Sequence, residues 1–145
     1  MREDGSMDSS IEGRLLVASP HLLDPNFYRS VVYIAEHGEE GALGLVLNRP
    51  TEEAVQDHLP DWAELTTAPS VVFVGGPVSN EIAVGLARCP VQPPESWAPA
   101  FDGSGLVDLS VGPESIGGVD ALRIFSGYSG WVTGQLEMEL ATESW

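Results

Sequence analysis

The sequence predicts an α+β fold in which a mixed or antiparallel sheet forms a β-barrel-like core with peripheral helices. Two observations lead to this class: candidate strands outnumber candidate helices, and short turns join several of the strands. A third concerns domain number, because 145 residues without an internal repeat or a linker suit one hydrophobic core. We expect residues 1–13 to form a flexible leader and residues 14–145 to form a single domain.

Four elements are expected before Pro50. Residues 15–18 form a short apolar run, which favours a buried strand over a helix of that length. Residues 24–27 suit one helical turn, because an aspartate can cap it and a proline can occupy its first position. Residues 30–35 and 43–48 are rich in strand-forming side chains, and the glycine-containing turn between them predicts an antiparallel hairpin.

A helix is expected directly after Pro50. Thr51 can cap it, and the helix dipole favours Glu52 and Glu53 in its first turn. A second helical turn is expected over residues 61–65. The sequence therefore predicts two short helical segments before the next strand.

The second half of the chain alternates apolar runs with segments rich in proline and glycine. The expected elements are strands over 71–74, 82–87, 106–111 and 121–125, a surface loop over 89–105 and a helix over 135–144. The sequence stops on Trp145, with nothing beyond it to cover the indole. We expect either that the sequence is shortened or that Trp145 packs back onto the body.

The charge balance excludes several classes of reaction. Aspartate and glutamate number 22 against six arginines, the formal net charge is −16, and the chain has no lysine. A Walker-type phosphate site, Schiff-base chemistry and pyridoxal chemistry all require a lysine amine. Direct binding of DNA or RNA is disfavoured, because affinity for the phosphate backbone comes from Lys and Arg. We interpret the acidic surface as a means of solubility.

The sequence also bears on location, cofactors and partners. No apolar stretch approaches the roughly 20 residues of a membrane span, and residues 1–13 lack the apolar segment of a secretory signal. Cys89, the single cysteine, cannot form an internal disulfide and matches no redox or zinc motif. We therefore predict a soluble cytoplasmic protein without a cofactor, whose partner is an unknown protein or small molecule.

The segment 127–131, Gly-Tyr-Ser-Gly-Trp, is the nearest approach to a hydrolase motif. The G-x-S-x-G elbow requires a glycine where Trp131 stands, because its strained turn tolerates only small neighbours around the serine. All three histidines precede Ser129, which excludes the chain order serine, acid, histidine. We predict no catalytic residue and interpret the segment as a glycine-rich turn that packs two aromatic side chains.

Carboxylates stand beside two histidines, at Glu36-His37 and Asp57-His58. Zinc sites need ligands at positions i and i+4 of a helix or in short-spaced pairs, and neither spacing occurs, so we predict no metal site. If the strand continues through them, Glu36 and His37 point to opposite faces. We interpret His37 and its acidic neighbours as a solvated turn.

Two segments at strand ends are candidate binding elements. Gly75, Gly76 and Pro77 follow a buried strand and can present backbone N–H groups to an anion, although a tight turn is the simpler interpretation. Arg49, after Asn48, is one of the few cations, and a guanidinium binds carboxylate or phosphate with two parallel bonds. Pairing of Arg49 with one of the acids is the simpler alternative.

Taken together, the order and spacing of several motifs resemble the YqgE/AlgH family, a bacterial group of uncharacterised proteins and proteins linked to regulation. The resemblance covers nearly everything after residue 13. The matching stretches are residues 13–20, Asp24-Pro25, Phe27, residues 29–34, Glu36-His37, residues 41–50, residues 74–78, residues 127–131 and residues 134–137.

The resemblance implies a compact α+β fold with a β-barrel-like core, a cytoplasmic location and no established reaction. Family members often carry alanine at the position of Ser129, which argues further against a nucleophile there. They often have cysteine where this chain has Ala35, so a thiol-based role cannot operate through that position. They commonly continue some tens of residues past the tryptophan that matches Trp145, which implies that this sequence is shortened.

The leading hypothesis is a non-enzymatic regulatory module that binds a small molecule or a protein. The first alternative is a hydrolase-type enzyme that uses His37 with neighbouring carboxylates. The second is a transcriptional regulator that contacts DNA directly, which the family label implies and the net charge of −16 disfavours. The predicted binding surface consists of Glu36, His37, Asn48, Arg49, Gly75, Gly76, Pro77, Tyr128, Trp131 and Gln135.

Overall fold

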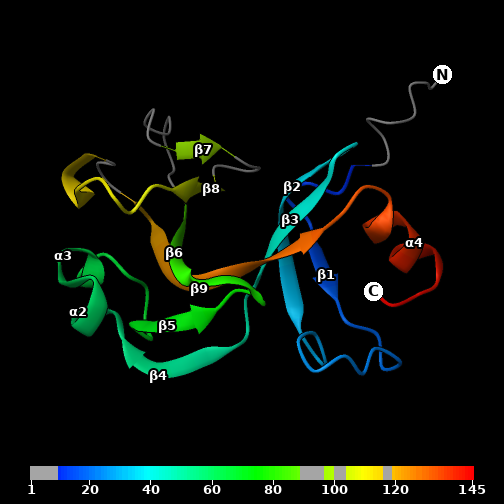
Figure 1. The fold of residues 1–145 in the computed structure, drawn as a ribbon. Helices are drawn as coiled ribbons and strands as arrows, with labels where there is room; N and C mark the ends of the chain where they lie inside the picture. The colour runs from blue at the N-terminus through cyan, green and yellow to red at the C-terminus, as the bar shows by residue number, and fades with distance from the viewer. Residues whose placement is uncertain (1–9, 89–96, 100–103, 116–118) are drawn as a thin grey trace.

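Strand β9, residues Ala121–Trp131, crosses the middle of the molecule and separates two halves of one mixed sheet (Figure 1). The computed structural model describes residues 10–88, 97–99, 104–115 and 119–145. Within these ranges it contains a nine-stranded sheet and short helices on the outside. The α+β class with a mixed sheet and peripheral helices is therefore confirmed.

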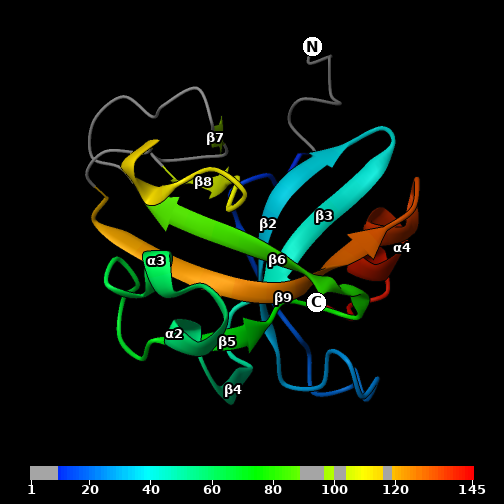
Figure 2. The same ribbon diagram turned by 60° about the vertical axis from the view of Figure 1, so that its left-hand side comes forward.

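One half consists of three antiparallel strands and the C-terminal helix, as Figure 2 shows from a second direction. The predicted strands and hairpin of this half are confirmed, because the first strand pairs with the second and the second with the third. The elements are β1 (Leu15–Val17), β2 (Val31–Gly38), β3 (Gly41–Val46) and α4 (Gln135–Ala141). Their buried core is Leu16, Val32, Ile34, Val46, Trp131 and Leu136.

The other half packs two short helices and a 3-10 turn around the remaining strands (Figure 1). The elements are β4 (Pro50–Ala54), α2 (Val55–His58), α3 (Pro60–Ala63), β5 (Val71–Val74), β6 (Val78–Arg88), β7 (Trp97–Pro99), β8 (Ser104–Val107) and η1 (Pro113–Ser115). Its buried core is Val55, Trp62, Ala87, Val107, Leu122 and Ile124. The strand predicted over 71–74 is confirmed.

The prediction that a helix begins at Thr51 is wrong, because residues 50–54 form strand β4. Ala54 lies opposite Val71 of β5. The Thr51 hydroxyl donates to the Val72 carbonyl at 2.6 Å, so it holds the strand to its neighbour and does not cap a helix. The acidic residues after Pro50 suit a first helical turn, but pairing of the segment ends, Pro50 and Ala54, with β5 places the segment in the sheet.

Two strands are longer than the sequence indicates. Strand β6 begins at Val78, four residues before the strand expected over 82–87. Strand β9 does not stop at residue 125 but continues through residues 127–131, so the glycine-rich turn predicted there is wrong. Gly127, at φ +71°, takes a backbone conformation that side chains rarely adopt, and this lets the strand continue past a tight approach of the chain.

The remaining predictions concern the region before β9. The loop predicted over 89–105 falls largely on residues 89–96 and 100–103, which lie outside the described residues. The strand predicted over 106–111 is observed as β8, which ends at Val107. The C-terminal helix is confirmed, although it ends at Ala141.

The described strands pair in the order β1-β2-β3-β9-β6-β8-β7, with β4 on β5 and β5 parallel to β9. No described pairing joins β1 to β7, so the sheet is not closed and the β-barrel-like core is not observed. Strand β9 belongs to both halves and carries Phe125, which is fully buried. Phe125 packs with Leu45 and Phe73 in a small central cluster between the two larger cores.

Trp145 packs back onto the body, which was one of the two alternatives expected for it. Its ring lies 6.1 Å from that of Trp131 and 5.5 Å from that of Phe27, in edge-on contacts with both. Such aromatic contacts contribute about 0.5–1.5 kcal/mol beyond the burial of apolar area. Within the described ranges, no helix has both the length and the apolar character needed to cross a membrane.

Candidate functional site

The structure places the predicted binding residues in two separate groups. Arg49, Gly76 and Pro77 line one small hollow. Glu36 and His37, together with Trp131, line another hollow next to the acidic turn between β2 and β3. The ten predicted residues therefore do not form one cleft, and each group has contacts of its own.

Asn48 and Arg49 fasten the loop between β1 and β2. The Asn48 Oδ1 atom accepts a hydrogen bond from the Val31 backbone N–H at 3.0 Å. Arg49 donates to two backbone carbonyls, that of Pro25 at 3.4 Å and that of Tyr28 at 2.6 Å. The pairing of Arg49 with an acid is not observed among the described residues, and both side chains serve to hold the loop.

Gly75 and Gly76 allow three chain segments to approach closely. The Gly75 N–H donates to the Ser126 carbonyl at 2.9 Å, and the Gly75 carbonyl accepts from the Ser129 hydroxyl at 3.0 Å. A Cβ atom on Gly76 would lie 2.3 Å from the Tyr128 carbonyl. The Gly75 N–H is already bonded and is not presented to an anion, and the two glycines permit this close approach of chain segments. Ser129 is fully buried, which is unsuited to a nucleophile.

His37 is buried in β2, so its interpretation as part of a solvated turn is wrong. Its side chain is 3% exposed, and Glu36 on the opposite face is exposed, as the alternation of a strand requires. The Nδ1 atom accepts the Ile11 backbone N–H at 3.0 Å, and Nε2 lies 2.9 Å from the Glu137 carboxylate. Because a backbone N–H can only donate, Nδ1 carries no proton in this arrangement and Nε2 donates to Glu137. Both ring nitrogens are therefore occupied.

Trp131 and Gln135 belong to the anchorage of α4. Glu139 accepts both indole N–H groups, those of Trp131 and Trp145, each at 2.9 Å. Gln135 donates to the other oxygen of the same carboxylate at 3.0 Å. At the start of the helix, the backbone N–H of Glu137 and then His37 lower the pKa of the Glu137 carboxyl. This second group of predicted residues is thus a structural network that docks the helix.

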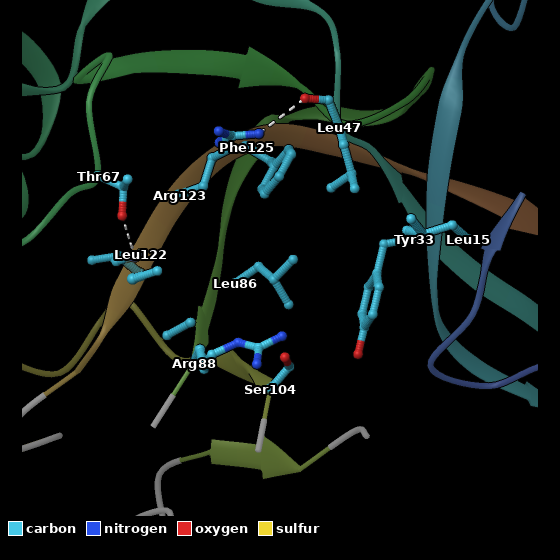
Figure 3. Close-up of a pocket in the computed structure, with 12 residues that line it drawn as sticks. Leu15, Tyr33, Leu47, Thr67, Leu86, Arg88, Ser104, Leu122, Arg123 and Phe125 are labelled. Atoms are coloured by element: carbon cyan, nitrogen blue, oxygen red, sulfur yellow. Dashed lines mark hydrogen bonds between the residues drawn. The ribbon is translucent and has the colours of Figure 1, made fainter. Parts of the chain in front are cut away.

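A cavity of about 300 Å³ lies between the two halves and contains none of the predicted residues (Figure 3). One wall comes from β1 and β2, and the other comes from β6, β8 and β9. The lining is mainly apolar, with hydroxyls and two guanidinium groups. The lining residues are Leu15, Tyr33, Leu47, Thr67, Leu86, Ala87, Arg88, Ser104, Ala121, Leu122, Arg123 and Phe125.

The cavity concentrates positive charge in an acidic chain. Two of the six arginines line it, and none of its described lining residues is one of the 22 acids. Arg123 donates to the Leu47 carbonyl at 3.1 Å, and its guanidinium lies 4.2 Å from the centre of the Phe73 ring. Figure 3 shows the side chains of Arg88 and Ser104 next to each other at one corner, with Tyr33 across from them. This is the strongest candidate site in the described structure.

Sheet register explains how the two arginines come to share the cavity. Leu86 lies opposite Arg123, and Arg88 lies opposite Ala121. Alternate residues of a strand share one face, so Leu86 and Arg88 of β6 join Ala121, Arg123 and Phe125 of β9 on the same face. The apolar and the cationic groups of the cavity are therefore fixed by strand pairing.

The comparisons with known proteins agree with this fold. A family model described as AlgH-like matches residues 15–145. The chain belongs to the AlgH-like family. A UPF0301 protein from Streptomyces coelicolor is 52% identical over 143 residues, which cover 94% of this chain and 74% of the relative. A UPF0301 protein from Mycobacterium leprae is 47% identical over 138 residues, covering 92% and 68% of the two chains.

Two solved structures of similar chains extend the comparison. The crystal structure of a Corynebacterium diphtheriae protein has a TM-score of 0.85 and 29% identity, covering 92% of this AlgH-like chain and 72% of its own. The solution structure of the AlgH protein from Pseudomonas aeruginosa has a TM-score of 0.66 and 31% identity, covering 90% and 72%. The names of these proteins state no activity, so the chemistry of the AlgH-like chain must be argued from its own residues.

Sequence reasoning missed the cavity because its polar residues are far apart in the chain. Arg88 and Arg123 stand in different strands, and neither belongs to a recognisable motif. One signal was present: in the stretch from Ala121 to Phe125, the arginine occupies the same strand face as an alanine and a phenylalanine. A cation at an apolar position of a strand indicates either a structural partner for its charge or a binding site for an anion.

Proposed function

We propose that this AlgH-like chain is a non-enzymatic regulatory module that binds a small molecule in the central cavity. One observation carries the proposal: an apolar cavity between the two halves is lined by Arg88 and Arg123 without a carboxylate among its described lining residues. Ligand sites in proteins are mainly apolar with a few convergent polar groups, and range upward from about 300 Å³. The volume of about 300 Å³ suits a compact metabolite and is too small for a dinucleotide.

The absence of an acid–base pair at the cavity supports binding without catalysis. The described lining residues include no histidine, cysteine, aspartate or glutamate, so the hydroxyls of Thr67 and Ser104 have no neighbouring general base there. The hydrolase alternative depends on His37. Because both of its ring nitrogens are occupied, the histidine has no free position from which to accept a proton.

The position of the cavity supports a regulatory role. Its walls belong to different halves of the sheet, with Tyr33 on β2 and Leu86 on β6. A ligand that contacts both walls favours the arrangement in which the walls are correctly spaced, and it can thereby alter how an outer surface meets a protein partner. We also propose a cytoplasmic location, which the single cysteine supports.

The test is a fragment screen monitored by backbone amide NMR. We expect some compounds to shift the resonances of Leu86, Ala121 and Phe125, and we expect Leu86→Trp to abolish these shifts by filling the cavity. Ile82→Trp is the matched control, because Ile82 lies on the same strand but outside the cavity lining and is 49% exposed. If no compound moves the resonances of the cavity residues, the proposal fails.

Direct DNA contact is a separate alternative that the charge disfavours. With a net charge of −16, the chain repels the phosphate backbone over most of its surface. We expect no binding to duplex DNA even at low salt, where electrostatic attraction is strongest. Salt-dependent binding in an electrophoretic or fluorescence-anisotropy assay would restore the DNA hypothesis.

A further inference from the structure

We infer that the cavity recognises an organic acid, with a carboxylate at the Arg88 corner and an apolar body against the inner walls. This inference rests on the proposed function and specifies the class of its ligand. It follows from the distribution of charge, from the donors at the corner, and from the volume between the apolar walls.

The charge distribution selects an anion. Most of the surface is acidic, with 22 carboxylates against six arginines, whereas the described lining of the cavity contains two arginines and no carboxylate. The Arg123 guanidinium is partly buried beside apolar walls, where electrostatic attraction is stronger than in water. An anion is therefore attracted to this cavity and repelled by most of the remaining surface.

The donors at the corner match a carboxylate. Arg88, at the end of β6, lies opposite Ser104 of β8, and Figure 3 shows the polar ends of these two side chains next to each other. A guanidinium presents parallel N–H groups in the fork that a planar carboxylate accepts, and hydroxyls can donate to the same oxygens. Phosphate sites commonly add a helix N-terminus or a glycine-rich loop. The described lining includes neither feature, so the chemistry favours carboxylate over phosphate.

Arg123 has a different role from Arg88. Its guanidinium is held by the Leu47 carbonyl and by the face of the Phe73 ring, so its position is already fixed. We assign the direct contact to Arg88, whose side chain makes no hydrogen bond with another described residue and is exposed. Arg123 adds positive potential deeper in the cavity. The two arginines are thus distinguishable by mutation.

The apolar walls define the rest of the ligand. Figure 3 shows Leu86 in the centre, with Leu47 and Phe125 at one end of the cavity and Leu15 beside Tyr33. These side chains leave a space of about 300 Å³. An aromatic ring or a short branched chain attached to the carboxylate fills such a space, and burial of its apolar surface contributes about 25 cal/mol per Å².

The experiment compares phenylacetate with phenylacetamide, which has the same shape and no charge. We expect phenylacetate to bind about tenfold more tightly in NMR titrations, since charge-assisted bonds are about twice as strong as neutral ones. In Arg88→Gln the two affinities should become about equal. Arg29→Gln is the control with the same loss of charge, because Arg29 lies outside the cavity lining, and it should keep most of the preference.

The outcomes separate the inference from the proposed function. Equal affinity of the acid and the amide for the unmodified protein, with shifts at Leu86 and Phe125, overturns the inference and leaves small-molecule binding in place. Tighter binding of phenyl phosphate than of phenylacetate overturns the choice of carboxylate. If neither phenylacetate nor phenylacetamide binds at millimolar concentration, the inference is overturned, and the fragment screen then decides the fate of the proposed function.

Discussion

Gly76 lies where the chain after β5 passes under β9. A Cβ atom there would come within 2.3 Å of the Tyr128 carbonyl and 2.4 Å of the Ser129 hydroxyl, and the residue has φ +157°. We expect Gly76→Ala to lower the free energy of unfolding by about 3 kcal/mol, because β9 or the turn must shift to make room. Urea unfolding monitored by tryptophan fluorescence measures the loss.

Gly38→Ala is the matched control for that substitution. Gly38 is in β2, and nothing lies within 4 Å of the Cβ atom it would acquire. This control should change stability by less than about 0.5 kcal/mol. Equal effects of the two substitutions would show that the contact with Tyr128 and Ser129 does not require a glycine at position 76.

Single residues show where reasoning from sequence is strong and where it fails. Glycines at 75 and 76 directly after a buried strand indicate a constrained backbone, and the structure shows a close approach of chain segments there. The burial of His37 could not be predicted, because it depends on Ile11 and Glu137, which approach from opposite ends of the chain. The polar residues next to His37 in the sequence therefore do not indicate the hydrogen bonds that surround its imidazole ring.

Helix α4 is attached to the sheet through a single carboxylate. Glu139 accepts the indole N–H groups of Trp131 and Trp145 and is bonded to Gln135. We expect Glu139→Ala to cost about 2 kcal/mol, because two partly buried donors lose a charged acceptor. Urea unfolding gives the total, and amide hydrogen exchange should show that the loss of protection is greatest in α4.

The control for this substitution is Glu143→Ala. Glu143 is exposed beyond the end of the same helix and has no hydrogen bond from its side chain among the described contacts. Both changes remove one negative charge from the same region. A loss as large in Glu143→Ala would attribute the effect to charge and not to the indole bonds.

The start of α4 makes part of the stability dependent on pH. The pKa of Glu137 is lowered in the folded protein, first by its own backbone N–H and then by His37. A carboxyl with a lowered folded pKa contributes its full stability above the unfolded pKa, which is about 4.3 for glutamate. It loses that contribution as the pH falls through the folded pKa. We expect Glu137→Gln to be less stable than the unmodified chain at pH 7.

Urea unfolding at pH 7, 5 and 3, roughly spanning the titration range of a glutamate, tests this expectation. The difference between the unmodified chain and Glu137→Gln should shrink toward zero at the acid end. A difference that is constant across the series would mean that the Glu137 carboxylate is not the group whose protonation weakens the docking of α4.

The elements were predicted best where apolar residues cluster. Residues 71–74 are four strand-forming residues in a row, and the sequence indicates their strand directly. Thr and Glu at residues 51–53 suit a first helical turn and predict a helix there, but these residues lie in β4, whose ends Pro50 and Ala54 pair with β5. The helix preference of such residues is worth roughly a few tenths of a kcal/mol each, and tertiary pairing outweighs it.

At the scale of the whole molecule, β9 makes the two halves interdependent. It pairs with β3 of one half and with β5 and β6 of the other, and Phe125 lies fully buried between them. We expect a single unfolding transition. Fluorotryptophan NMR resonances of Trp62 in α3 and of Trp131 in β9 should lose intensity at the same urea concentration.

Phe125→Ala extends this prediction. Removal of a fully buried phenylalanine costs about 3–5 kcal/mol, and the two resonances should move to a lower midpoint together. Val132→Ala, at an exposed valine just after β9, should leave both midpoints nearly unchanged. Separate midpoints for Trp62 and Trp131 would show that the halves are independent units.

The candidate site itself is a property of the whole molecule. Arg88 and Arg123 come together only through the register of β6 and β9, and Tyr33 is added from β2. The sequence contains all three residues, but the register that brings them together cannot be derived until the strand boundaries are known. The fold class was therefore predictable, whereas the cavity could be found only from the structure.

The central place of β9 also has a consequence for biosynthesis. Strands β3, β5 and β6 all lie before Ala121 in the chain, so they leave the ribosome before the strand that joins them. Until β9 emerges, their unpaired edges can associate with neighbouring nascent chains. The net charge of −16 makes such chains repel one another. We expect the acidity of the sequence to limit such association during the interval in which its sheet is incomplete.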